Sequence, residues 1–335
     1  YLAVRDDQEF NRKVAVKLVK RGMDTDYILR RFRQERQILA TLEHPFIAGL
    51  LDGGTSPDGR PYFVMELVEG RTLYDYCDQN RLNLRERLRL FLKIAESVAF
   101  AHQNFVIHRD LKPSNILITA QGLPKLLDFG IAKLLNPENP DASQTFTLMR
   151  AMTPKYASPE QIKGEPLTFA TDIYSLGVLL YEILCGHRPY LPKTAQPHEL
   201  ARVICEETPA PPSVAVAEND ESALDEYKNR GRPPAEIIAE KRAASSIEEL
   251  QRELTGALDS VAMKCLEKKA RRRYATVKDL IADVNAYFAG EPLKIPLYQT
   301  RAERPADTST TTGGSSVAVL PLKLMGKGEG DYLSL

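Results

Sequence analysis

An eight-residue string, His108-Arg109-Asp110-Leu111-Lys112-Pro113-Ser114-Asn115, constrains this chain more than any other feature of its sequence. It places a carboxylate, an ammonium group and a carboxamide at short spacing, and transfer of a phosphoryl group needs such groups. Asp110 could orient an incoming hydroxyl and receive its proton. Asn115 offers a hard oxygen ligand for Mg²⁺, and Lys112 could reach a transferred phosphate as a point charge.

The alternative interpretation of this string is a polar surface turn between a helix and a strand. The tripeptide His108–Asp110 alone would fit either interpretation. The complete string favours the chemical one. So does a second motif, Asp128-Phe129-Gly130, which follows a short strand and begins thirteen residues beyond Asn115.

Together these two motifs resemble the catalytic loop and the metal-binding motif of the protein kinase family. The form Lys112-Pro113-x-Asn115 resembles the serine/threonine branch, and the segments 265–268 and 273–276 resemble its eukaryotic-like bacterial members. The resemblance covers about residues 1–290. It implies an α+β, bilobal protein-kinase fold with a small β-rich N-lobe and a large α-helical C-lobe.

The resemblance also implies ATP as the phosphoryl donor, with Mg²⁺ or Mn²⁺ as the metal ion. Asp110 would then be the catalytic base and Lys112 would contact the transferred group. Asn115 and Asp128 would bind the metal. Three further residues would support this arrangement structurally: His108, Arg109 and Phe129.

The strand Val14-Ala15-Val16-Lys17 resembles the one that carries the family's nucleotide-binding lysine. A lysine in an apolar strand is costly to bury unless its ammonium group is paired. We expect Glu35 to be the partner, because it lies beside the apolar stripe of Phe32 and Leu39 on the following helix. Lys17 would then hold the α- and β-phosphates of ATP. The alternatives are an edge-strand lysine in water and a solvated helix charge.

The segment Met65–Gly70 resembles the hinge between the two lobes. By this resemblance Met65 is the gatekeeper, and the backbone of Glu66 and Val68 binds the edge of the adenine. Two apolar side chains, which could equally be plain core residues, would enclose the adenine ring: Ala15 and Leu117.

Two acidic residues resemble structural positions of the family. Glu160 of Ser158-Pro159-Glu160 should pair with a buried arginine, for which Arg273 fits best and Arg271 and Arg272 are alternatives. Asp172 matches the aspartate that holds the catalytic-loop backbone. Its alternative is a plain helix N-terminal charge.

The segment between Gly130 and Ser158 resembles an activation loop. Thr153 matches the threonine that bridges Asp110 and Lys112. Because Arg109 precedes Asp110, we expect control by phosphorylation, since a phosphate could pair with that arginine. Three hydroxyls are candidate acceptors: Ser143, Thr145 and Thr147.

The pattern of apolar residues and turns divides the chain into an N-lobe, residues 1–69, and a C-lobe, residues 70–290. Expected strands cover 1–4, 14–19, 48–51 and 62–67, and expected helices cover 73–79, 84–103, 170–185, 251–267 and 275–289. The Pro-, Ala- and charge-rich stretch 208–250 is typical of a surface insertion. Residues 291–316 resemble a linker, and 317–335 the start of a truncated second domain.

The family's glycine-rich phosphate loop should lie just before Tyr1 and is absent from the sequence, and Gly53-Gly54 falls in a later turn. We therefore expect an N-terminally truncated kinase domain. Weak nucleotide binding by the chain as given would follow.

Charge and cysteine content restrict the partners. Forty-five basic residues balance forty-five acidic ones, so we expect neither a nucleic-acid nor a membrane-surface partner. No apolar stretch is long enough to cross a bilayer. The four separated cysteines favour reduced thiols and a cytoplasmic location. The expected partners are protein substrates and a second copy of the chain for autophosphorylation in trans.

Two other functions stay open at this stage. A small-molecule phosphotransferase of related fold would share Asp110 and Asp128, but Ser158–Glu160 and Asp172 favour a protein substrate. A pseudokinase that acts as a scaffold is disfavoured by the retention of Lys17 beside the two aspartates.

Overall fold

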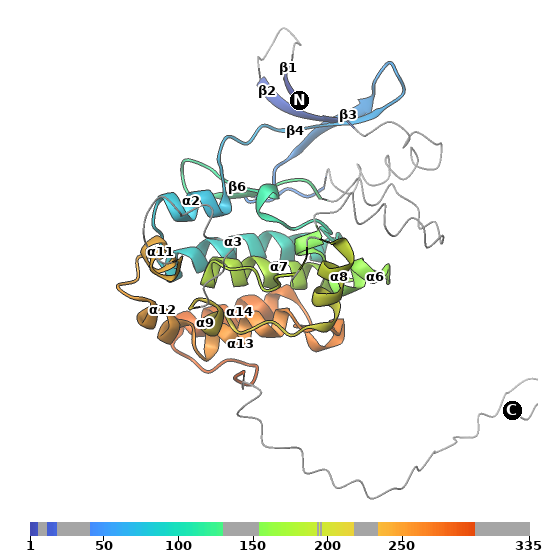
Figure 1. Cartoon of the computed structure of the whole chain (residues 1–335). Helices are drawn as coiled ribbons and strands as arrows, with labels where there is room; N and C mark the ends of the chain where they lie inside the picture. Colours follow the sequence, from blue (N-terminus) through green and yellow to red (C-terminus); the bar gives the residue numbers. More distant parts are fainter. Residues whose placement is uncertain are drawn as a thin grey trace, which may run out of the picture. The chain divides into compact units, whose positions relative to one another are not determined.

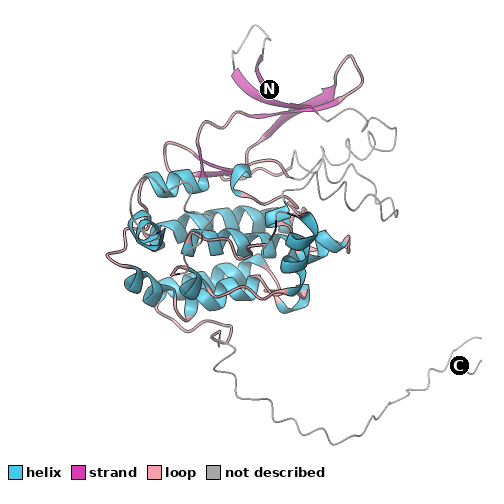
Figure 2. Cartoon of the chain, in the orientation of Figure 1, coloured by secondary structure: helices cyan, strands magenta, loops and turns pink. Residues whose placement is uncertain are grey.

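Runs of β-branched and apolar residues near the start of the chain form an antiparallel sheet. The computed structural model describes residues 1–5, 12–18, 41–129, 154–192, 194, 196–217 and 234–298. The sheet has the order β1-β2-β4-β3, and Figure 2 draws its strands in magenta. Its strands are β1 (Leu2–Arg5), β2 (Arg12–Leu18), β3 (Leu50–Thr55) and β4 (Pro61–Glu66).

The register of this sheet decides which side chains share a face. Ala15 lies opposite Met65, and Lys17 lies opposite Phe63. Because side chains alternate between the faces of a strand, these four residues lie on one face. Phe63 is buried within the main hydrophobic core. This face, with Lys17 on it, is therefore turned toward the rest of the unit.

The C-lobe is helical and carries a second, small sheet in the order β5-β6-β7. The strands are β5 (Arg71–Thr72), β6 (Ile116–Ile118) and β7 (Pro124–Leu126). The helices are α2 (Leu73–Gln79), α3 (Leu84–Gln103), α6 (Pro159–Lys163), α7 (Phe169–Cys185), α8 (Pro197–Glu206), α9 (Pro212–Ala215), α11 (Pro234–Lys241), α12 (Ile247–Leu254), α13 (Ala257–Cys265) and α14 (Val277–Ala289). Single 3₁₀ turns cover Pro113–Asn115, Pro154–Tyr156 and Ala270–Arg272.

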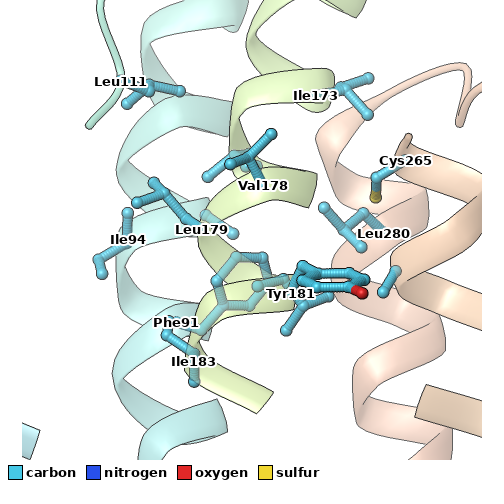
Figure 3. Packing of buried hydrophobic residues seen from close by; sticks show 14 of the residues in the cluster. Phe91, Ile94, Leu111, Ile173, Val178, Leu179, Tyr181, Ile183, Cys265 and Leu280 are labelled. Atoms are coloured by element: carbon cyan, nitrogen blue, oxygen red, sulfur yellow. The ribbon is translucent and has the colours of Figure 1, made fainter. Parts of the chain in front are cut away.

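Helix α7 is the centre of the helical core. Every residue from Thr171 to Cys185 is buried, as expected of a helix that is apolar on all sides. It packs beside α3 and α13 (Figure 1). Figure 3 shows Leu179 and Tyr181 of α7 in one hydrophobic cluster with Phe91 of α3 and Leu280 of α14. The site described below is built on the N-terminal end of this helix.

Most of the expected strands and helices agree with the structure to within a few residues where they are described. The single helix expected at 251–267 is wrong, because α12 ends at Leu254 and α13 begins at Ala257, after Gly256 with a φ of 89°. Helices α2 and α3 have the predicted bounds. A capping box fixes the start of α3, because Asn83 and Glu86 satisfy each other's backbone N–H groups. The helix expected around residues 28–42 lies outside the described part of the chain except for its last two residues, which are not helical.

The prediction that 208–250 is a surface insertion is wrong for its described residues. Val216, Ile238 and Leu250 are buried in the core. Arg242 is also buried, and its guanidinium donates to the carbonyl oxygens of Glu182, Ile183 and Leu184 at 2.6–3.0 Å. These carbonyls lie in the last turn of α7. The charged arginine that suggested a surface segment therefore caps the C-terminal end of this buried helix.

The linker expected from residue 291 does not begin there. The backbone N–H of Lys294 donates to Asp283 at 2.8 Å, and that of Tyr298 donates to Ser260 at 2.7 Å. Leu293 and Ile295 pack against the core. The compact unit accordingly extends from Tyr1 to Tyr298, and a domain starting near 317 falls outside the described residues. Within the part that is described, no helix is both long and apolar enough to cross a membrane.

Gly177 permits the close approach of α7 and α13. A Cβ atom at this position would lie 2.4 Å from Cβ of Cys265. We predict that Gly177→Ala lowers the free energy of unfolding by about 1–3 kcal/mol, because the extra methyl overpacks the core. The higher helix propensity of alanine would offset only part of this loss. Denaturant unfolding measures the difference.

Gly49→Ala is the matched control, since a Cβ atom there meets nothing within 4 Å. Equal stabilities of the two variants would contradict the packing of α7 on α13.

Candidate active site

The carboxylate of Asp172 holds the backbone of the catalytic-loop string. It is buried in the first turn of α7. It accepts hydrogen bonds from the N–H groups of His108 at 2.7 Å and Arg109 at 2.9 Å, and from Nε2 of His102 at 2.8 Å. Burial opposes ionisation of Asp172, but the hydrogen bonds outweigh it and keep the carboxyl pKa below its ordinary value. The plain helix-charge alternative is therefore excluded.

Arg109 has a left-handed backbone, with φ of 66°. Such a conformation is costly for a non-glycine residue and needs support from its surroundings. Asp172 supplies this support on the N–H side, and Gln161 of α6 donates to the Arg109 carbonyl at 2.8 Å. The turn therefore ties the string to both α7 and α6.

Three functional groups of the string meet at Asp110. Nζ of Lys112 lies 2.8 Å from Oδ2 of Asp110. The side-chain amide of Asn115 donates to the carbonyl of Asp110 at 2.8 Å and to its Oδ2 at 3.0 Å. These contacts hold the Asp110 carboxylate in one orientation, and its side chain remains 19% exposed. A fixed but accessible carboxylate is what the orientation of a hydroxyl requires.

His108 joins this string to the second motif. Its ring is buried, and Nε2 donates to the carbonyl of Leu127 at 3.0 Å while Nδ1 accepts from the N–H of Asp110 at 3.3 Å. Burial lowers the pKa of His108, which favours the neutral ring that this pair of bonds requires. The ring also lies 4.6 Å from the ring of Phe129. Asp110 and Asp128 are thus brought to one place through His108.

Lys17 reaches the same place from the sheet. Its Nζ lies 2.9 Å from Oδ1 of Asp128. Asp128 itself has a left-handed backbone, with φ of 49°, another costly conformation of the kind that clusters at functional sites. The expected partner, Glu35, lies outside the described residues, so the predicted Lys17–Glu35 pair stays a prediction.

The predicted hinge residues connect the end of β4 in the first sheet to β5 in the second. Met65 and Ala15 are neighbours in the first sheet, and Leu117 lies in β6 of the second. Val68 is half-buried between β4 and β5. Sequence reasoning missed that the Glu66 side chain pairs with Lys125 of β7 at 2.9 Å and accepts from the Gly49 N–H at 3.3 Å.

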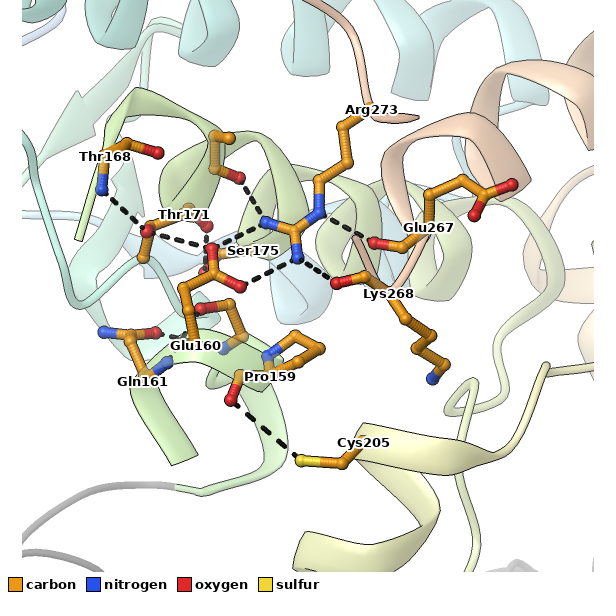
Figure 4. Close-up of polar contacts among 12 residues, drawn as sticks. Pro159, Glu160, Gln161, Thr168, Thr171, Ser175, Cys205, Glu267, Lys268 and Arg273 are labelled. Atoms are coloured by element: carbon orange, nitrogen blue, oxygen red, sulfur yellow. Dashed lines mark hydrogen bonds and ion pairs between the residues drawn. The ribbon is translucent and has the colours of Figure 1, made fainter. Parts of the chain in front are cut away.

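Glu160 and Arg273 form the predicted buried ion pair (Figure 4). The two guanidinium NH₂ groups donate to the two carboxylate oxygens at 2.7 and 2.8 Å. Thr171 also donates to Glu160, at 3.0 Å. Burial opposes ionisation of Glu160, but Arg273 outweighs it and keeps the carboxyl pKa below its ordinary value. Arg271 and Arg272 are exposed, so the alternatives to Arg273 are excluded.

Several predicted residues lie outside the described part of the chain: Glu35, Gly130, Ser143, Thr145, Thr147 and Thr153. Sequence reasoning also missed a buried group beside the site. Glu182 of α7 accepts hydrogen bonds from the hydroxyls of Tyr74 and Tyr156. A glutamate inside an apolar helix is a signal of such pairing, because a buried charge needs partners.

A comparison with family models identifies the protein family of this chain. The model described as the protein kinase domain matches residues 2–283. The chain belongs to the protein kinase family. The expected bilobal α+β fold is thereby confirmed, and the string at 108–115 lies within the matched residues.

The similar proteins are bacterial kinases. The chain is 33% identical over 316 residues to the serine/threonine-protein kinase PknB of Mycobacterium tuberculosis, a match that covers 92% of this chain and 44% of that protein. It is 33% identical over 279 residues to a probable serine/threonine-protein kinase of Clostridium perfringens, covering 83% of this chain and 35% of that protein. The chain thus spans less than half the length of these curated relatives.

A solved structure supports the fold alone. The kinase domain of PknI from Mycobacterium tuberculosis superposes with a TM-score of 0.56 at 21% sequence identity. The match covers 86% of this chain and 90% of that one.

The residues of the kinase site fit the divalent metal that the family implies. Because Nδ2 of Asn115 donates to Asp110, the amide oxygen of Asn115 is directed away from these two acceptors. That oxygen and the Asp128 carboxylate are hard ligands of the kind Mg²⁺ prefers. Magnesium usually takes only one or two protein ligands and completes its shell with phosphates and water, so these two groups suffice.

Loss of the Arg273 guanidinium would leave the Glu160 carboxylate buried without its partner. We predict that Arg273→Met lowers the free energy of unfolding at neutral pH by about 3–5 kcal/mol. A carboxyl pKa that is lower in the folded state stabilises the fold above the ordinary value of 4.5, and this stabilisation is lost as the pH falls. The difference between wild type and variant should therefore shrink below about pH 4.5. Denaturant unfolding across pH measures it.

Arg272→Met provides the control, because this neighbouring arginine is exposed. The ion pair would have no structural importance if both variants were as stable as the wild type.

Proposed function

We propose that the chain is a serine/threonine protein kinase that transfers the γ-phosphoryl group of ATP to serine and threonine hydroxyls of proteins, including its own activation loop. The single observation that carries this proposal is the Asp110 carboxylate, fixed by Lys112 and Asn115 within 3.0 Å. No covalent step by the protein is required, so a well-oriented carboxylate beside a phosphate-binding cation accounts for the activity.

Each remaining group has a role in the proposed reaction. Asp110 orients the acceptor hydroxyl and takes up its proton, and Lys112 offsets the charge of the transferred group. Lys17 binds the α- and β-phosphates, and Glu35 pairs with the ammonium group of Lys17. When bound, Mg²⁺ (or Mn²⁺, which shares its preference for oxygen) neutralises phosphate charge, and Asn115 and Asp128 hold it. The adenine lies between Ala15 and Leu117, below Met65, with its edge on the backbone of Glu66 and Val68.

The finer expectations complete the proposal. The kinase domain comprises an N-lobe, 1–69, and a C-lobe from residue 70, and it acts in the cytoplasm. Phosphorylation of Ser143, Thr145 or Thr147 in trans, by a second copy of the chain, activates it through Arg109. Its reaction class is that of the non-specific serine/threonine protein kinases. The pairing of Glu160 with Arg273 and of Asp172 with the loop supports a protein substrate, since these residues shape the segment next to Asp110.

Asp110→Asn tests the assigned base. We predict that it lowers incorporation of labelled phosphate from ATP into a generic basic protein by about 10²–10⁴-fold, the usual contribution of a general base. Its circular dichroism and unfolding midpoint should match those of the wild type. Glu165→Gln, a change at a half-exposed carboxylate, is the matched control and should retain activity.

Three outcomes would contradict the proposal. Persistent labelling by the Asp110 variant would show that another group is the base. Phosphorylation of aminoglycosides in preference to proteins would instead assign the chain to small-molecule phosphotransferases. Nucleotide binding without any phosphoryl transfer would favour a pseudokinase scaffold over an active kinase.

A further inference from the structure

The carboxylate of Glu66 lies at the start of the hinge and has no part in the proposed reaction. Its Oε2 is 2.9 Å from Nζ of Lys125 and accepts from the backbone N–H of Gly49 at 3.3 Å. The backbone N–H of Glu66 in turn donates to the carbonyl of Gly49 at 2.9 Å. Residue 66 is thus held in place through both its backbone and its side chain.

The Glu66 side chain does not share the face of the first sheet that is proposed for the adenine. Successive residues of a strand point to opposite faces, and Met65 lies opposite Ala15 in the register of β2 and β4. Glu66 lies opposite Val14 and therefore belongs to the other face. Its carboxylate can act on a nucleotide only through the backbone that carries it.

Lys125 carries the other half of the ion pair and belongs to the second sheet. It lies directly opposite Leu117 in the register of β6 and β7, so these two side chains share one face of that sheet. Leu117 is proposed to enclose the adenine ring from this side. The ion pair therefore joins the strand that leads into the hinge to the strands that form the opposite wall of the proposed adenine site.

The segment before β3 completes the connection between the two sheets. The N–H of Leu126 donates to the carbonyl of Phe46 at 2.7 Å, and the N–H of Ala48 donates to the carbonyl of Leu126 at 3.0 Å. Gly49 follows directly and is bonded to Glu66. Strands β7 and β4 are thus both bound to one short stretch of backbone, and the ion pair adds a direct contact between them.

We propose that Glu66 and Lys125 are positioning residues for the adenine, because their ion pair fixes the hinge backbone relative to the strand of Leu117. The inference rests on the proposed function, since it concerns the adenine site assigned there, and it adds two side chains that do not touch the nucleotide. The carbonyl of Glu66 would accept from the exocyclic amino group of the base. A carbonyl whose direction is fixed beforehand lowers the cost of forming that bond.

Nucleotide binding tests the inference without any turnover. Competition against a fluorescent ATP analogue gives the Kd of three compounds: ATP, purine riboside triphosphate, which lacks the exocyclic amino group, and inorganic tripolyphosphate. Lys125→Met should raise the Kd of ATP about fivefold, as expected for the loss of one partly exposed ion pair. It should raise the Kd of purine riboside triphosphate less and leave that of tripolyphosphate unchanged.

Further variants locate the effect in the ion pair. Glu66→Gln should act like Lys125→Met, and the double variant should lose little more than either single one, because both changes remove the same contact. Lys125→Arg keeps the charge and should retain the preference for ATP. Lys278→Met, at an exposed lysine of α14, is the control that should bind all three compounds like the wild type.

Three results would overturn the inference alone. The first is an unchanged ratio of the Kd values of ATP and purine riboside triphosphate in Lys125→Met. The second is an equal weakening of tripolyphosphate binding, which would show a general loss of structure. The third is tighter binding of ATP by this variant, because the ion pair would then restrain the hinge rather than position it.

Two results separate the inference from the proposed function. A wild type that binds ATP and purine riboside triphosphate equally would contradict the adenine site itself, and the inference with it. Absence of phosphorylation together with the expected nucleotide binding would contradict the kinase activity alone and would support the positioning role.

Discussion

The candidate active site depends on one buried carboxylate, that of Asp172. It satisfies two consecutive backbone N–H groups, of His108 and Arg109, which would otherwise be buried without partners. An unsatisfied buried donor costs about 1–3 kcal/mol, so this interaction selects the left-handed turn at Arg109. Because Asp172 lies in the first turn of α7, the helix dipole stabilises its negative charge. Helix α7, which is buried from Thr171 to Cys185, therefore positions the catalytic-loop string.

From this turn, short contacts lead in two directions. Through His108, the loop is fixed to the Leu127 carbonyl and to Phe129, which places Asp128 and then Lys17. Through Gln161 the same loop is fixed to α6, whose Glu160 is paired with Arg273. The segment with Asp128 and Lys17 and the segment of α6 with Glu160 are therefore both held to this one loop. This explains why the motifs, although far apart in sequence, depend on one another physically.

Local chemistry accounts for what the sequence could predict. The capping box at Asn83 fixed the start of α3, and the apolar run of α7 ended at Gly186, whose φ of 79° favours glycine. The string at 108–115 pointed to Asp110 and Asn115 because phosphoryl transfer needs those side-chain types at short spacing, and the structure places the two side chains within hydrogen-bonding distance. Arg273 fitted the family pattern best, but only the structure excluded its neighbours Arg271 and Arg272, which are exposed.

The sequence could not predict contacts between segments that are far apart along the chain. The pair of Glu66 with Lys125 joins residues 59 apart, and Tyr74 and Glu182 are 108 apart, so neither pattern nor spacing signals them. Composition misled at 208–250 for the same reason. The charge of Arg242 looked like a surface feature, but its partners are the carbonyls at the end of α7.

The most direct test of this dependence is amide hydrogen exchange in Asp172→Ala. If the carboxylate holds the loop, the amides of His108 and Arg109 should exchange much faster than in the wild type. Amides in the middle of α7 should remain protected, which shows that the lobe is still folded. Unchanged protection of both loop amides would contradict the central claim that Asp172 determines the shape of the catalytic loop.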